Sequence, residues 1–168
     1  IGRGIGPRLE ALDVLAVLRR DPDAPQDLRE KALYLASRIL EMSGALATGS
    51  GYREARRVLD SGMALKKFAD IVNVQGPREL PPEAPYRDVV NSPADGRIRE
   101  IDCWEVARVA KRAGAPANAT AGVRMLKGIG DVVSKGEPLF EVHSCSAEQL
   151  KAATGYAGSH PEMITFGF

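Results

Sequence analysis

Glycines and an arginine at the start of the chain are the residues whose spacing most directly suggests chemistry. Gly2, Gly4 and Gly6 surround Arg3 and are followed by Pro7, which favours the first position of a helix. A glycine loop before a helix directs backbone N–H groups and the positive end of the helix dipole at whatever lies in front, and both favour an anion. An arginine guanidinium would add a fork of donors. The loop is a candidate anion site, or alternatively a connection that lets a helix pack tightly.

The known glycine-loop motifs do not match this stretch. No Gly-Lys-Ser/Thr follows it, which excludes a P-loop, and its spacing differs from the dinucleotide-binding fingerprint. Only Ile1 stands where a strand would lead into such a loop. We therefore expect the chain to begin in mid-structure, and its lack of an initiator methionine agrees with a fragment or a processed chain.

His143 and Cys145 are two apart on a predicted strand, so their side chains would lie on one face and could supply two zinc ligands. Cys103 and His160 would have to converge with them from distant segments. We therefore predict no metal site, and interpret His143 as a half-buried histidine of the strand. Neighbouring carboxylates such as Glu10 with Asp13 have no evident catalytic partner.

Composition limits the class of protein. The chain has 168 residues, of which 44% are hydrophobic and 27% charged, and 23 Lys and Arg nearly balance 22 Asp and Glu. The basic residues are scattered, so the charge pattern of a nucleic-acid binder is missing. No apolar run approaches the roughly 18 residues of a membrane span. We expect a globular protein without nucleic-acid or membrane partners, and the two cysteines suit the cytoplasm.

Apolar spacing predicts that the first part of the chain is helical. One helix is expected over residues 7–20, and Asp27 with Glu30 forms a capping-box pattern that opens a second, with Gly44 as its stop. A third follows the turn at 49–51, and a fourth follows Gly62 and ends near residue 75. Their Leu and Ala stripes are interpreted as core.

A proline-rich stretch then separates two parts of the chain with different sequence patterns. We predict a helical segment over 1–76, a linker over 77–87 and a small α+β domain over 88–168. Strands are expected over 88–91, 97–101, 122–127, 138–143 and 163–168, with the short run 132–133 between two turns, and helices are expected over 104–112 and from Ser146 onward.

The segments 92–98 and 130–139 together resemble the barrel-sandwich of biotinyl and lipoyl carrier domains. Those domains carry a modified lysine on the hairpin after the second segment. Here residues 143–146 hold that place without a lysine, and Lys127 precedes the motif. The fold is expected to be shared without the carrier chemistry, although a non-catalytic carrier or structural module remains an alternative.

Three ordered motifs give a wider resemblance. The chain resembles the thymidine phosphorylase family in three stretches. The first is the Gly-Arg-Gly-Ile-Gly-Pro run with the Leu-Glu-Ala and Asp-Val-Leu that follow it, at 2–15. The others are the stretch from Ser61-Gly62 to Gln75-Gly76 and the segment 130–143. The likeness is greatest to its type 2 branch, which includes the AMP phosphorylases. Met63 and the Gly76-Pro77 pair depart from residues common in that family.

That resemblance implies the latter part of a longer enzyme: the end of a central α/β domain, followed by a hammerhead-like C-terminal domain. Family members cleave the bond between base and sugar with inorganic phosphate, and use no other cofactor. Their catalytic residues come from upstream segments, so none is expected here, and Gly2, Arg3 and Gly4 would be substrate-binding wall positions. The parent protein would be a homodimer acting on a pyrimidine nucleoside or nucleotide.

Overall fold

The computed structural model describes residues 1–76 and 79–167, and its contacts divide the chain into two compact units. The helical unit holds Ile1–Gly2 and Ala11–Glu79, and the C-terminal unit holds Arg3–Glu10 and the chain from Leu80 onward. Pro77 and Arg78, at the start of the predicted linker, and Phe168, at the end of the last predicted strand, lie outside the described residues.

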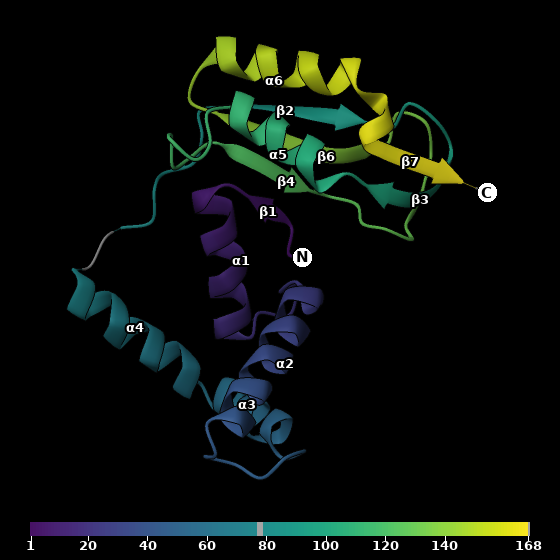
Figure 1. The fold of residues 1–168 in the computed structure, drawn as a ribbon. Coiled ribbons are helices and arrows are strands. Elements are labelled where there is room, and N and C mark those ends of the chain that lie inside the picture. Colours follow the sequence, from purple (N-terminus) through teal and green to yellow (C-terminus); the bar gives the residue numbers. More distant parts are fainter. Residues whose placement is uncertain (77–78, 168) are drawn as a thin grey trace. The chain divides into compact units, whose positions relative to one another are not determined.

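The predicted helices are present. They are α1 (Pro7–Arg19), α2 (Gln26–Met42), α3 (Gly51–Asp60) and α4 (Met63–Gln75) (Figure 1). A buried apolar cluster joins α1, α2 and α3, with Val17, Leu33, Ala55 and Leu59 at its centre. Gly51 allows α3 to approach α2, because a Cβ there would lie 2.4 Å from the Ser37 carbonyl oxygen.

The start of α2 differs from the prediction. Pro25 holds the N-cap position in an extended conformation without a side-chain cap, so the capping box of Asp27 and Glu30 does not form. The Asp27 carboxylate instead accepts the N–H groups of Gly2 and Leu28, at 3.0 and 2.8 Å. Because Asp27 lies inside the first turn, its carboxylate still faces the positive end of the helix.

The apolar stripe of α4 is the clearest departure within the helical unit. We predicted it as core, yet none of the α4 residues, all of which the structure describes, is buried. Phe68 and Ile71 are 37% and 47% exposed. Helix α4 packs chiefly on α3, and of its residues Ala64 packs against the buried cluster.

The C-terminal unit is built from two antiparallel sheets and two helices. Its strands after β1 are β2 (Tyr86–Asn91), β3 (Gly96–Ile101), β4 (Gly122–Met125), β5 (Val132–Val133), β6 (Pro138–Ser144) and β7 (Ile164–Gly167). Over the described residues, one sheet has the order β1-β4-β6-β2 and the other the order β5-β3-β7. The predicted α+β class is confirmed.

Helices α5 (Cys103–Arg112) and α6 (Ala147–Ser159) pack on each other and on the larger sheet, and the short turn η1 (Pro161–Met163) leads from α6 into β7 (Figure 1). Asp102 caps α5 by accepting two backbone N–H groups, and Ser146 caps α6 as the sequence predicted. The core between sheets and helices includes Val109, Val123 and Phe140.

One strand was not predicted. Gly4–Ile5 forms β1, which pairs antiparallel with β4, Gly4 opposite Arg124 and Ile5 opposite Val123. Gly4 and Ile5 of the glycine loop are therefore part of the larger sheet of the C-terminal unit. No described helix is both long and apolar enough to cross a membrane.

Candidate functional site

The backbone amides of the glycine loop face carboxylates of the chain itself. Gly2 donates its N–H to Asp27, and Gly6 donates its N–H to Glu10 Oε1 at 2.9 Å. Glu10 lies in the first turn of α1, where the helix dipole favours a negative charge. The N–H groups of Gly2 and Gly6, which suggested an external anion, are thus engaged by carboxylates of the chain.

The glycines serve close packing. A Cβ at Gly4 would lie 2.5 Å from the backbone carbon of Leu9, and a Cβ at Gly6 would lie 2.4 Å from the Ala121 carbonyl oxygen. On the facing strand, a Cβ at Gly122 would lie 2.2 Å from the carbonyl oxygen of Ile5. This geometry favours the second interpretation of the loop, in which glycines bring a helix start close to its support.

Arg3 is held through its backbone, where its carbonyl oxygen accepts the N–H of Met125 at 2.7 Å. Gly4 follows it in β1. The structure therefore brings Arg3 and Gly4 together at the edge of the larger sheet, whereas Gly2 belongs to the helical unit. Their assignment as substrate-binding wall positions remains a prediction.

An open pocket of about 430 Å³ lies beside the loop in the C-terminal unit. It is lined by loop and α1 residues (Ile5, Gly6, Pro7, Glu10) and by residues of α5 and the following turn (Ala107, Ala110, Lys111, Ala115, Pro116). Glu10 and Lys111 supply its charged side chains. No local pattern predicts that α5 lies here, because nearly 100 residues separate the two segments.

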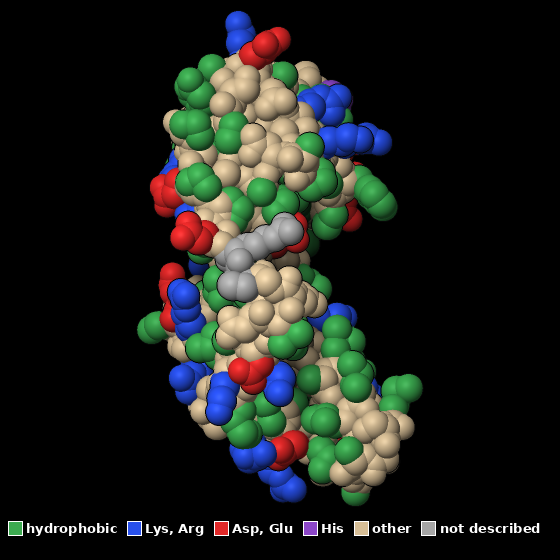
Figure 2. All heavy atoms as spheres, turned by 90° about the vertical axis from the view of Figure 1, so that its left-hand side faces the viewer, with side chains coloured by type: hydrophobic (Ala, Val, Ile, Leu, Met, Phe, Trp, Pro, Cys, Tyr) green, Lys and Arg blue, Asp and Glu red, His purple; other side chains and the backbone are tan. Residues whose placement is uncertain are grey.

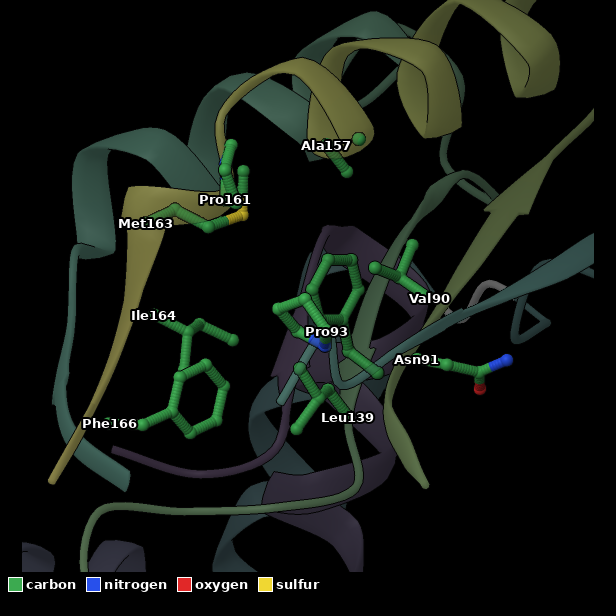
Figure 3. A pocket seen from close by; sticks show the side chains of 11 residues that line it. Val90, Asn91, Pro93, Leu139, Ala157, Pro161, Met163, Ile164 and Phe166 are labelled. Carbon is green, nitrogen blue, oxygen red and sulfur yellow. The ribbon is translucent and has the colours of Figure 1, made fainter. Parts of the chain in front are cut away.

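A second pocket, of about 100 Å³, is apolar and lies between the two sheets and the end of α6 (Figure 3). Phe166, Leu139 and Met163 point toward it, while the amide of Asn91 points away. It offers packing space and no group that could transfer a proton or bind a phosphate.

His143 is buried, as a side chain of a central strand, with 5% of its surface exposed. Burial lowers the pKa of its imidazole, and Glu141, whose Oε2 lies 3.3 Å from Nε2, opposes that shift. Cys145 follows the strand and its Sγ contacts the hydroxyl of Thr120. Cys103 begins α5 and is exposed, and His160 stacks on Tyr156. Within residues 1–76 and 79–167, no three potential ligand side chains lie close enough to hold a metal ion.

The place of the carrier hairpin is occupied by the end of β6 and the cap of α6, and no lysine stands there. Lys127 forms an ion pair with Glu137, which raises the pKa of the lysine. A lysine amine held in this ion pair is protonated, and it is not free to accept a biotinyl or lipoyl group.

Comparison with known proteins gives the relationships of the chain. Residues 97–158 match the model of the pyrimidine nucleoside phosphorylase C-terminal domain. A protein of Ralstonia nicotianae named "Putative thymidine phosphorylase" is 48% identical over 163 residues, which cover 97% of this chain and 32% of that protein. Proteins of the same name from Rhodopseudomonas palustris and Bradyrhizobium sp. (strain ORS 278) are each 46% identical over 168 residues, covering 95% and 99% of this chain.

The likeness extends over nearly the whole chain, including the helical unit that the family model does not reach. The chain spans about a third of the length of these curated relatives.

Proposed function

Because the chain carries the C-terminal domain of the pyrimidine nucleoside phosphorylases and is related along nearly its whole length to proteins named as thymidine phosphorylases, we propose that it is the C-terminal part of such an enzyme. The parent is a pentosyltransferase that cleaves the bond between base and sugar with phosphate, giving a free base and a sugar 1-phosphate. The observation that carries this proposal is the 48% identity over 97% of the chain.

The chemistry of that reaction explains why this part does not work alone. Breaking the glycosidic bond develops positive charge on the sugar, phosphate attacks, and the leaving base needs a proton or a hydrogen-bond donor. Of the two charged side chains at the loop pocket, Glu10 already accepts the N–H of Gly6. We assign the phosphate site and the base-binding groups to the remainder of the parent, with Gly2, Arg3 and Gly4 as wall positions.

The other features of the parent follow from the same proposal. It needs inorganic phosphate as co-substrate and no further cofactor, acts as a homodimer in the cytoplasm, and takes a pyrimidine nucleoside. A nucleoside monophosphate such as AMP is the alternative substrate, and the nearly balanced charge of the chain agrees with the absence of a nucleic-acid partner.

The test compares two proteins. One is the chain alone, and the other is a chimera in which this chain replaces the C-terminal third of the Ralstonia nicotianae relative. Each is incubated with phosphate and thymidine, uridine or AMP, and release of the free base is measured. We expect release by the chimera only, with thymidine or uridine. Turnover by the isolated chain would contradict the assignment of the catalytic groups to the remainder of the parent. Turnover of AMP but not of thymidine or uridine would favour the alternative substrate.

A further inference from the structure

Helix α2 carries more apolar surface than the helical unit covers. Leu33 and Ser37 are buried against α3 and the core of the unit. A second stripe, at the helical spacing of Leu35, Ile39 and Met42, leaves these side chains 49%, 67% and 86% exposed. A helix with two apolar faces is typical of an element covered on both sides.

This open stripe borders a groove of about 420 Å³ formed by α1 to α4. Its lining is apolar throughout: Val17, Leu18, Ala32, Leu33, Ala36, Ile39, Leu40, Ala55, Val58, Leu59 and Ala64. The small side chains of Ala32, Ala36 and Ala64 leave the space that larger ones would fill. Single exposed apolar residues are ordinary on a protein surface, whereas a contiguous apolar groove marks an interaction site.

Helix α4 adds to the same unit the exposed side chains of Phe68, Ile71 and Val74, the last 89% exposed. Charged side chains instead cover α3, where Arg53, Arg56 and Arg57 are exposed. Figure 2 shows hydrophobic side chains in the open in its lower half, beside charged ones. The unit thus has apolar and charged surfaces that can be compared within one molecule.

We propose that the groove and the open stripe of α2 are the docking surface for the remainder of the parent protein, which meets it with an apolar face. The inference rests on the proposed function, in that the chain is one part of a longer enzyme. Two observations choose this occupant. The relatives are about three times as long as the chain they match, and the match to them extends over the helical unit as well as the C-terminal unit.

The test measures solvent access to single cysteines. Ile39→Cys and Phe68→Cys report on the apolar surface, and Arg53→Cys on α3 is the matched control in the same unit. Each is made in the chain alone and in the chimera, and thiol labelling is followed by peptide mass spectrometry, which separates these sites from Cys103 and Cys145. In the chain alone at low concentration, all three sites should label at similar rates.

In the chimera, labelling at residue 39 should slow by about tenfold or more while residue 53 changes by less than about twofold. Equal labelling of Ile39→Cys in both proteins would overturn the proposal. So would protection in the chain alone: if it depends on concentration, a second copy occupies the groove, and if it does not, the chain covers its own surface.

A second measurement uses Ile39→Asp in the chain alone, where the exposed side chain should tolerate the charge with little change in the midpoint of urea unfolding. A large loss there would show that the groove is internal core and would contradict the proposal. These outcomes do not depend on phosphorolysis, so a chimera that protects residue 39 but releases no base supports the docking surface and contradicts the proposed activity.

Discussion

At the scale of single residues, Gly122 is the glycine, among those described in the C-terminal unit, whose added Cβ would lie closest to another backbone atom. Gly122→Ala would place a Cβ 2.2 Å from the Ile5 carbonyl oxygen and 3.0 Å from Leu9 Cδ1. We expect the free energy of unfolding to fall by about 1–3 kcal/mol, because β1 and the start of α1 must move. Urea unfolding followed by circular dichroism measures it.

Gly155→Ala is the matched control for that variant. Gly155 lies inside α6 with nothing within 4 Å of a built Cβ, so the substitution should stabilise the chain by about 0.5–1 kcal/mol through helix propensity. If both variants lost the same free energy, close approach at Gly122 would not be the cause.

His143 makes stability depend on pH. Burial lowers the pKa of His143. The positive charges of Arg87 and Arg124 lower this pKa further, whereas Glu141 raises it. Below the ordinary histidine pKa of about 6.5 the unfolded chain binds a proton that the folded chain takes up only at lower pH, so stability falls as pH drops through that window. His143→Gln should reduce the difference between the urea midpoints at pH 8 and pH 5.5. His160 is present in both proteins, and an unchanged difference would assign the pH dependence elsewhere.

At the scale of elements, β1 contributes an edge strand to the larger sheet. Deleting residues 1–5 removes the Arg3 carbonyl that accepts the N–H of Met125. We expect exchange of the Met125 amide to become faster by about tenfold or more. The neighbouring Leu126 amide, which donates to the Leu139 carbonyl, is the control. If the Met125 amide still exchanged slowly in the deletion variant, its pairing with Arg3 would not be what protects it.

Periodic elements could be predicted, and elements made by distant partners could not. The stripe of α1 and the cap at Ser146 carry local signals, and both match the structure. Gly4–Ile5 has only two strand residues and becomes a strand because β4, far along the sequence, lies beside it. Asp27 failed as a cap because Pro25 already held the N-cap position. The loop pocket was missed for the same reason as β1, since α5 and the turn that follows it supply the far side of the pocket.

At the scale of the whole molecule, two separate apolar clusters support the two units. Leu33 in one and Leu139 in the other are each 2% exposed, so they form a matched pair. Substituting either by Ala should cost about 2–5 kcal/mol in its own unit. Calorimetry should show two transitions, with Leu33→Ala lowering one and Leu139→Ala the other. A single transition lowered equally by both would contradict independent unfolding.

The pairing of β1 with β4 also sets an order of events during synthesis. Residues 3–10 are translated before residues 11–79 of the helical unit, yet their partner strand β4 follows only after that unit has been made. The helical unit can fold in that interval, whereas the larger sheet must wait and then close a long loop, which is entropically costly. The stretch translated earliest in this unit is therefore among the last to reach its native place, and until then the edge of β4 stays open to pairing with another nascent chain.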